Sequence, residues 1–313
     1  MVIGLDMMGG DYAPLEAAKG AALYLKEDQR ASLQLYGDQS QLRELIQEFA
    51  LSLSRVTVVP TTEVIGMHEH PTKALKEKPQ SSISIGFHHL VSGKIDAFVS
   101  AGNTGAMLVG TLYSIKAVEG VLRPTISTII PKENGNTGLL LDVGLNADSK
   151  PEHLNQFAVL GSLYAQHILN IHKPRVALLN IGEEEGKGNM LMQAAYPLLK
   201  ENERINFIGN IEGRDILLDK ADVMVCDGFT GNIVLKMAES LFEITGRKKI
   251  QHEYFDLFNF ENYGGTPVLG VSKPVIIGHG ISHALAFKNM LALAVRMLES
   301  NLLDTMRKSF ASA

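Results

Sequence analysis

The 313-residue sequence contains one cysteine, no tryptophan and no excess of basic residues. The single cysteine, Cys226, excludes an internal disulfide and is typical of a reducing compartment. The net charge of -5 provides no overall positive field to attract nucleic acid or anionic lipid. Any site for an anion must therefore be built locally.

Long hydrophobic runs are also missing. No apolar run approaches the roughly 18 residues that a membrane-spanning helix needs. The opening segment MVIGLD is an apolar strand that ends at Asp6, which is too short for a secretory signal. Hydrophobic residues make up 45% of the chain and charged residues 20%, as in folded globular proteins. We expect a cytoplasmic protein with a self-supporting core.

Short β-rich apolar runs alternate with helical patterns along the chain. The predicted strands are VIGLD, SLQLYG, RVTVVP, DAFVSAG, TISTIIP, GLLLDVG, RVALLNIG, INFIGN, DVMVCDG and PVIIGHG. Helices are predicted at PLEAAKGAALYLKED, SQLRELIQEFA, PEHLNQFAVLGSLYAQHIL and GNMLMQAAYPLLKEN. Apolar runs separated by helices predict a parallel sheet covered on both faces, which is a doubly wound α/β fold.

The stretch VSAGNTGAMLVG leads from a predicted strand directly into a predicted helix. Gly102 and Gly105 leave backbone amides uncovered, and Asn103 or Thr104 can cap the helix. Helix N-termini of this kind favour anions. A tight turn with an ordinary helix cap explains the same residues, so this segment alone leaves both interpretations open.

Small polar residues recur at the carboxyl ends of seven predicted strands. They are Asp6, Gly9, Gly10 and Asp11; Gly102, Asn103, Thr104 and Gly105; Asp142, Gly144 and Asn146; Asn180 and Gly182; Asn210, Glu212 and Gly213; Asp227, Gly228, Thr230, Gly231 and Asn232; and His279, Gly280 and Ser282. Open α/β sheets bind ligands outside these ends, which predicts one extended crevice. Turn chemistry alone would place Gly, Asn and Asp at several of these positions.

An anion in such a crevice needs cations. Lys187 lies between two glycines in EEEGKGN and can reach a phosphate, or it can balance the preceding glutamates in solvent. Lys236 lies four residues after Asn232 on a predicted helix and can point to the crevice or to solvent. Arg214 follows two residues after Glu212.

Other candidate motifs are weaker. His279 and His283 have the spacing of a metal pair, but no carboxylate stands at a matching position. His68 and His70 fit surface positions on an extended segment. The sequence contains neither GxGxxG nor GxxxxGK[ST], which disfavours the common dinucleotide and triphosphate loops. Cys226 is interpreted as a small core residue rather than as a nucleophile.

A further set of segments carries a family resemblance. LDMMGGDYAP, SAGNTGA, LLLDVGLNAD, KPEHLNQFA, LLNIGEEEGKGN, FIGNIEGRDI, ADVMVCDGFTGNIVLK, NYGG and HGISHALAFKNM follow the order seen in the PlsX family. The chain resembles these phosphate acyltransferases over nearly its whole length. The resemblance implies a three-layer α/β/α sandwich of the isocitrate-dehydrogenase-like type. It also implies one phosphate acyltransferase domain over residues 1–313, with a shortened helical and aromatic excursion at about 237–261.

The resemblance implies transfer of a fatty acyl group from the thioester of acyl carrier protein to inorganic phosphate. The product, an acyl phosphate, would feed phospholipid synthesis, and no cofactor or metal is implied. We assign catalytic roles to Lys187, Asn232, Lys236 and His279. Substrate binding is assigned to Asp6, Gly9, Gly10, Asp11, Gly102, Asn103, Thr104, Gly105, Asp142, Gly144, Asn146, Asn180, Gly188, Asn189, Asn210, Glu212, Asp227, Gly228, Thr230 and Gly231.

The implied partners are acyl carrier protein, phosphate and a second copy of the chain, with peripheral contact to an anionic membrane and its glycerol-3-phosphate acyltransferase. In the excursion, Arg247 to Lys249 precede an aromatic stretch that includes Phe255 and Phe258, as in interfacial elements. These aromatics can equally pack on a partner or in the core. Two rival functions stay open: a nicotinamide-dependent dehydrogenase of related fold, and a non-catalytic scaffold that binds acyl carrier protein.

Overall fold

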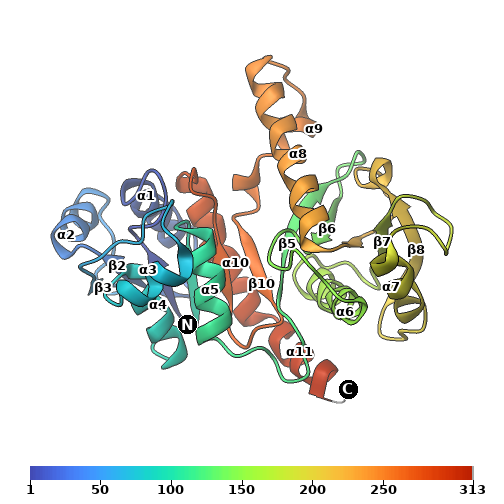
Figure 1. Ribbon diagram of the computed structural model, residues 1–313. Helices are drawn as coiled ribbons and strands as arrows, with labels where there is room; N and C mark the ends of the chain where they lie inside the picture. The colour runs from blue at the N-terminus through green and yellow to red at the C-terminus, as the bar shows by residue number, and fades with distance from the viewer. Residues whose placement is uncertain (312–313) are drawn as a thin grey trace. The chain divides into compact units, whose positions relative to one another are not determined.

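The computed structural model describes residues 1–311 (Figure 1). Its contacts divide the chain into two compact units, each assembled from separate stretches of sequence. The first unit contains Met1–Ala117 and Phe260–Glu299. The second contains Val118–Asn259 and the described part of Ser300–Ala313. The single domain that the sequence suggested therefore stays a prediction, and the two units are described separately below.

The first unit is built on a sheet whose strands run in the order β3-β2-β1-β4-β11-β10. The strands are β1 (Val2–Asp6), β2 (Ser32–Gly37), β3 (Val56–Pro60), β4 (Ala97–Ser100), β10 (Thr266–Leu269) and β11 (Val275–Ile277). Strands β3, β2, β1, β4 and β11 are parallel to one another. Their carboxyl ends consequently share one edge of the sheet.

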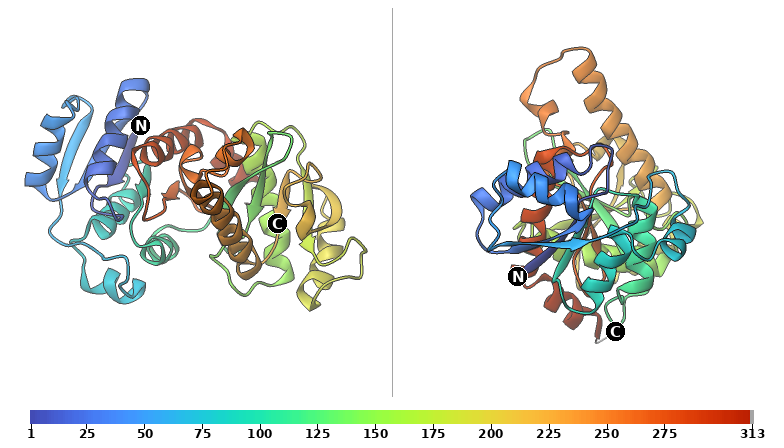
Figure 2. Two further views of the ribbon diagram at one scale, coloured as in Figure 1. Left: turned by 90° about the horizontal axis from the view of Figure 1, so that it is seen from above. Right: turned by 90° about the vertical axis from the view of Figure 1, so that its left-hand side faces the viewer.

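Helices cover both faces of this sheet (Figure 2). They are α1 (Leu15–Glu27), α2 (Gln39–Glu48), α3 (Pro71–Glu77), α4 (Ser82–Val91), α5 (Thr104–Ser114) and α10 (Ala284–Glu299). Helix α1 packs against α10 and α2, while α4 packs against α5. Glycines permit the close approaches, because a Cβ on Gly20 would press on Phe287 and a Cβ on Gly110 would press on Phe87.

The second unit has its own sheet in the order β5-β6-β9-β7-β8. The strands are β5 (Thr125–Pro131), β6 (Thr137–Leu141), β7 (Arg175–Asn180), β8 (Asn206–Glu212) and β9 (Val223–Val225). Strands β6, β9, β7 and β8 are parallel. The helices are α6 (Pro151–His167), α7 (Met190–Lys200), α8 (Gly228–Arg247), α9 (Glu253–Asp256) and α11 (Leu302–Ala311). The doubly wound α/β class predicted from the sequence is confirmed.

Two strand pairs correct the expectation of a purely parallel sheet. Strand β5 runs antiparallel to β6, because only residues 132–136 connect them and a parallel crossover needs a dozen or more residues. Gly135 in that connection has φ of +82°, as a tight turn requires. Strand β10 is antiparallel to β11. The sequence did not predict β10, whose short TPVL segment contains Pro267.

The excursion predicted at about 237–261 comprises most of α8 and the short α9, which packs back on α8 (Figure 1). Its aromatic residues pack on one another, with ring centroids of Tyr254 and Phe258 5.4 Å apart. Phe258 is only 8% exposed. Packing in the core, one of the alternatives for these aromatics, is therefore supported for Phe258. Membrane contact by the excursion stays a prediction.

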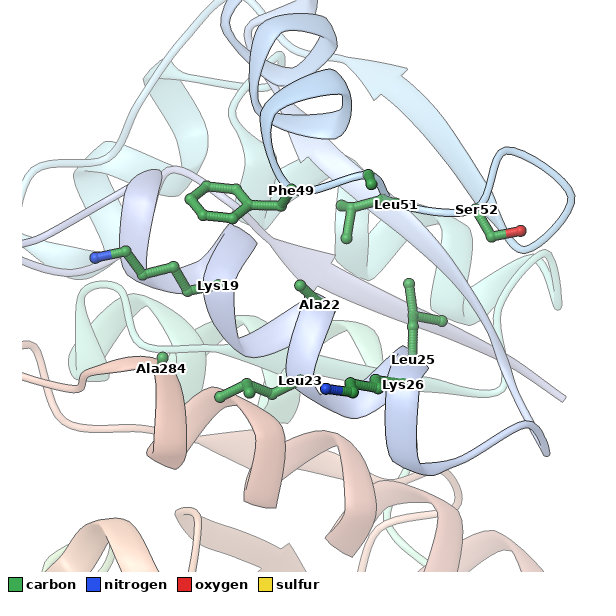
Figure 3. Close-up of a pocket in the computed structure, with 10 residues that line it drawn as sticks. Lys19, Ala22, Leu23, Leu25, Lys26, Phe49, Leu51, Ser52 and Ala284 are labelled. Carbon is green, nitrogen blue, oxygen red and sulfur yellow. The ribbon is translucent and has the colours of Figure 1, made fainter.

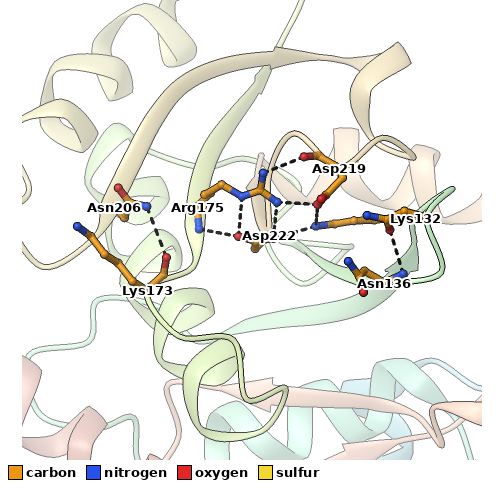
Figure 4. A network of polar contacts seen from close by, with 8 residues as sticks. Lys132, Asn136, Lys173, Arg175, Asn206, Asp219 and Asp222 are labelled. Carbon is orange, nitrogen blue, oxygen red and sulfur yellow. Dashed lines mark hydrogen bonds and ion pairs between the residues drawn. The ribbon is translucent and has the colours of Figure 1, made fainter.

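A network of ion pairs lies at the amino ends of the second unit's parallel strands (Figure 4). Lys132, with a side chain only 1% exposed, lies 2.9 Å from Asp219 and 2.8 Å from Asp222. Arg175 contacts the same two carboxylates. Burial opposes ionisation of Asp222, but hydrogen bonds from Arg175 and Lys132 lower its pKa far below the ordinary value. Each of these four side chains thus has an oppositely charged partner.

Within residues 1–311, each helix is too short or too polar to span a bilayer.

Candidate active site

In the first unit, the loops after β1 and β4 are joined through a buried carboxylate. Asp6 is fully buried and accepts hydrogen bonds from the Ser100 hydroxyl at 2.6 Å and from the Met8 amide at 2.9 Å. Ser100 in turn accepts a bond from the Gly102 amide at 2.9 Å. Burial raises the pKa of Asp6, and these hydrogen bonds act against that rise. Asp6 therefore fixes the start of the Gly-rich turn.

Glycine is required where these loops meet. A Cβ on Gly9 would lie 2.6 Å from the Gly102 nitrogen, so a side chain there would push the two loops apart. Gly10 has φ of +106°, a conformation that L side chains rarely adopt. The Asp11 amide donates to the Gly280 carbonyl at 2.7 Å. The loop after β11 thereby joins those after β1 and β4.

Asn103 is the cap of α5, which confirms one of the two capping residues considered. Its Oδ1 accepts from the Ala106 amide at 2.9 Å, and its Nδ2 donates to carbonyls of Gly66, Met67 and Glu69. The carboxamide is thus committed to holding the turn and the segment before α3. The sequence did not indicate a role for this segment, because its MHEHP pattern predicted only exposed histidines. His68 and His70 are exposed, as predicted.

The amides that begin α5 remain as possible donors. No described residue accepts a hydrogen bond from the backbone amide of Thr104 or Gly105, as expected for the first turn of a helix. Thr104 is exposed. Gly105 is constrained by packing, because a Cβ there would collide with Pro71.

The two histidines after β11 do not face a common ligand. The ring of His279 lies 4.5 Å from that of Phe260, whereas His283 stacks on Tyr12 and lies 3.6 Å from Glu16. Among the described residues, no group of three or more potential metal ligands occurs.

In the second unit, Asp142 organises the loop after β6. Its carboxylate accepts hydrogen bonds from the amides of Gly144, Leu145 and Asn146, and from the Asn146 side chain. Asn146 also donates to the Pro124 carbonyl at 2.9 Å. Burial raises the pKa of Asp142, and the hydrogen bonds counteract it. No cation is among these contacts, in contrast to the amino edge.

Helix α8 begins against this loop. Asp227 caps it by accepting from the Thr230 amide at 2.9 Å and the Thr230 hydroxyl at 2.8 Å. Gly228 and Gly231 allow the contact, since a Cβ on Gly228 would lie 2.6 Å from the Asn146 carbonyl and one on Gly231 would overlap that of Asp142. The exposed Asn232 lies beside Gly144. Its carboxamide is thus presented at the strand ends.

Cys226 is a core residue, as the sequence suggested. It is fully buried, and burial raises the pKa of its thiol. Its Sγ donates to the Asp142 carbonyl at 3.6 Å. A thiol held in this way is a poor nucleophile.

A pocket of 640 Å³, the strand-end pocket, opens among the strand ends of this unit and is lined by both apolar and polar side chains. Five predicted site residues line it: Asn180, Gly188, Asn189, Glu212 and Thr230. Both ends of the Asn180 carboxamide bond within its own loop. Its Nδ2 donates to the Lys187 carbonyl, and its Oδ1 accepts from the Ile181 amide. Asn189 caps α7. These residues shape the pocket wall.

Arg214 is a lining residue that the sequence assignment left out. Its guanidinium lies 2.8 Å from the Glu212 carboxylate, and its side chain is 74% exposed. The position of Arg214 next to Glu212 was the sequence signal for a pocket residue. The exposure of the Arg214 side chain could not be judged from the sequence.

The two predicted lysines are exposed and have acidic neighbours. Lys187 lies 3.9 Å from Glu184, and Lys236 lies 2.8 Å from Glu239. Glu183 and Glu185 instead pair with Lys220 and Lys200. Lys187 thus has the loosest of these pairings.

Asn210 lies beneath the same acidic loop. Its Nδ2 donates to the Glu184 carbonyl at 2.9 Å, while its buried Oδ1 accepts from no described residue.

Another hollow, of 570 Å³, lies in the first unit between α1 and residues 49–52 (Figure 3). Lys19 and Lys26 stand at its wall, and Lys19 is paired with Glu16 at 2.7 Å. No residue of the predicted site lines it.

The structure therefore gathers the predicted residues into two strand-end clusters, one in each unit. The first holds the loops after β1, β4 and β11, and the second holds those after β6, β7, β8 and β9. A single crevice formed by all seven strand ends stays a prediction.

Known proteins match this chain over nearly its whole length. The family described as "Fatty acid synthesis protein" matches residues 1–305. The phosphate acyltransferase of Dictyoglomus turgidum is 43% identical over 319 aligned positions, covering 96% of this chain and 94% of the relative. That of Halothermothrix orenii is 41% identical, with 98% of each chain covered.

Solved structures agree on the fold. A phosphotransacetylase from Streptococcus pyogenes superposes with a TM-score of 0.67 at 18% identity, covering 96% of this chain and 94% of the other. The EutD phosphotransacetylase from Staphylococcus aureus gives 0.64 at 18% identity, with 95% and 94% covered. Together with the sequence relatives, these observations establish that the chain belongs to this fatty acid synthesis family, the PlsX family, and is an acyltransferase.

Proposed function

We propose that the protein transfers a fatty acyl group from the thioester of acyl carrier protein to inorganic phosphate, giving an acyl phosphate for phospholipid synthesis. The observation that carries this proposal is the match to phosphate acyltransferases over nearly the whole chain, combined with a family description that names fatty acid synthesis.

The reaction needs no covalent enzyme intermediate. A phosphate oxygen attacks the thioester carbonyl carbon, and the carbonyl oxygen carries the negative charge of the tetrahedral intermediate. Its collapse breaks the carbon–sulfur bond, releasing acyl phosphate and a thiolate that takes up a proton. Because phosphate is already nucleophilic, the protein has to position it and stabilise the oxyanion. The buried Cys226 plays no part in this scheme.

In the first cluster, we assign phosphate oxygens to the amides of Thr104 and Gly105. Asn103 and Asp6 act as positioning residues, since their side chains are occupied in holding the Gly102–Gly105 turn. His279 is assigned as the proton donor to the leaving thiolate. A free thiol has a pKa near 8.5, so this assistance is a modest contribution.

In the second cluster, Lys187 and Lys236 neutralise developing charge and Asn232 donates to a substrate oxygen. Asn180 has the chemistry of an oxygen ligand, but its hydrogen bonds to its own loop support a positioning role instead. Asp142 and Asp227 position the loop after β6 and the start of α8.

Subunit association and membrane contact are further parts of the proposal. Phe229, Ile233 and Met237 on α8 are 64%, 52% and 74% exposed, which supports a homodimer contact on this helix. A peripheral membrane contact would bring the amphiphilic product close to a membrane-bound glycerol-3-phosphate acyltransferase.

The test is product trapping. Purified protein, acyl carrier protein thioester and phosphate are incubated, and hydroxylamine converts acyl phosphate to a hydroxamate identified by mass spectrometry. Since thioesters also react with hydroxylamine, a reaction without phosphate is the control. Phosphate-dependent hydroxamate is expected. Its absence with an active donor protein refutes the proposal, and saturable binding of NAD would point to a dehydrogenase.

A further inference from the structure

A second pocket in the second unit is almost wholly apolar. It has a volume of 470 Å³ and lies along α8, facing the segment after η1 (Gly213–Asp215). Val234, Leu241 and Ile244 contribute from α8, with Ile216, Leu217 and Phe258 from elsewhere in the unit. Among the described residues that line it, Ser240 carries the only polar side chain.

This apolar pocket adjoins the strand-end pocket. Gly213, Ile216 and Val234 line both hollows. A Cβ on Gly213 would meet no atom within 4 Å, so the junction has open space. The apolar pocket therefore forms an extension beside the strand-end pocket, whose wall contains the polar side chains of Asn180, Asn189, Glu212, Arg214 and Thr230.

The extension has a direction. From Val234 at the junction to Ile244, α8 advances about 15 Å, at about 1.5 Å per residue. Phe258, packed edge-on against Tyr254, lines the extension but not the strand-end pocket. The lining thus continues well beyond the junction and is anchored by a residue of the aromatic cluster.

We propose that this extension binds the fatty acyl chain of the thioester substrate, with the carbonyl end of the chain toward the strand-end pocket. The proposal rests on the function proposed above and adds the location of the chain. A long apolar chain joined to one polar reacting group matches an apolar pocket that adjoins polar side chains at one end. A second copy of the chain is the competing occupant, because the exposed Met237 on α8 also lines this pocket.

The proposal predicts that the pocket sets chain-length preference. Each methylene that leaves water for an apolar site gains about 0.8 kcal/mol in transfer free energy, which corresponds to about fourfold in binding. Ala238 lines the extension near the junction, so Ala238→Phe would fill space needed by long chains. We expect kcat/KM for a hexadecanoyl donor to fall by about tenfold or more relative to an octanoyl donor.

Ala194→Phe is the matched control, because Ala194 is exposed on α7 and lines neither pocket. It should leave the ratio of hexadecanoyl to octanoyl activity unchanged. Ile244→Phe alters the distant part of the extension at a residue that is 44% exposed. It should affect only the longest donors, and it decides the question if Ala238→Phe fails to fold.

A binding assay separates this proposal from the proposed reaction. Binding of cis-parinaric acid, a fluorescent fatty acid, is measured by titration and by displacement with hexadecanoate. We expect wild type and Ala194→Phe to bind it and Ala238→Phe to bind about tenfold more weakly or worse. If wild type binds but forms no acyl phosphate, the reaction is wrong and the pocket stands.

Two results would overturn the pocket assignment. One is acyl phosphate formation with the same chain-length ratio and fatty acid affinity in folded Ala238→Phe, or in Ile244→Phe if the first variant is unfolded. The other is a change in subunit association without a change in selectivity, which would assign the extension to contact between copies of the chain.

Discussion

The two edges of the second unit's sheet handle buried charge in opposite ways. At the amino edge, Asp222 is held by Lys132 and Arg175, and its pKa is lowered. At the carboxyl edge, Asp142 is held by amides alone, and burial raises its pKa. Paired charges connect neighbouring strands, whereas a carboxylate bound by amides shapes a loop. The contrast separates a stabilising edge from a candidate reactive edge.

The largest effect is expected at the amino edge. Asp222→Asn removes one partner from the buried Lys132 and should lower the free energy of unfolding by about 3–5 kcal/mol. Asp219→Asn is the control, since Asp219 has a 42% exposed side chain and should cost about 1 kcal/mol or less. Denaturant unfolding measures both. Equal effects would show that the edge is not organised around Asp222.

The pH dependence follows from the lowered pKa of Asp222. Because the folded state holds this proton less tightly than the unfolded chain, the contribution is complete above the ordinary pKa of 3.8 and is lost as the pH falls toward the folded value. The stability gap between wild type and Asp222→Asn should therefore shrink below about pH 4. A gap that widens with acidification would contradict this assignment.

The next largest effect concerns reactivity at the carboxyl edge. Lys187→Ala removes a loosely paired charge and should lower kcat/KM for phosphate by about a hundredfold, as loss of one oxyanion donor does. Its unfolding free energy should change by about 0.5 kcal/mol or less. Lys200→Ala, which removes the partner of Glu185 on the same loop, should keep its activity. Nearly full activity in Lys187→Ala would remove Lys187 from the site.

Close packing at the start of α8 gives a smaller effect. Gly231→Ala would force the added methyl onto the Asp142 carbonyl and should cost about 1–3 kcal/mol of stability, together with acyl transfer activity. Gly213→Ala has open space around its Cβ and serves as the control. Thermal unfolding compares the two, and similar melting temperatures would mean that α8 shifts freely.

The smallest effect is expected from the cap of α8. Asp227→Ala loses the hydrogen bonds to Thr230 and should destabilise the protein by about 1 kcal/mol. Asp227→Ser keeps a capping oxygen and should recover most of that loss. If Ser and Ala behave alike, the carboxylate is needed for more than the cap.

The sequence predicted much of the architecture because apolar runs and helix patterns are local signals. All ten predicted strands occur, and Asn103, one of the two expected capping residues, caps α5. The antiparallel β5–β6 pair was missed although its short connection was visible in ENGNTG. Strand β10 gave too little signal in its four residues.

The site was less predictable because residue type does not reveal which atoms are already bonded. Asn103 and Asn180 have the chemistry of oxygen ligands, but both carboxamides are committed to their own turns. The sequence left membrane contact and packing open for Phe258, which packs inside the second unit. The apolar pocket joins residues from four separate stretches of sequence, so no local pattern could indicate it.

The central claim is that phosphate attacks the acyl thioester. The most direct test supplies acyl carrier protein thioester and phosphate labelled with oxygen-18 at every position, followed by mass spectrometry of the product. The account predicts acyl phosphate that retains all the phosphate label, with an unlabelled carbonyl oxygen. Release of free fatty acid without acyl phosphate, or no consumption of the thioester, would contradict it.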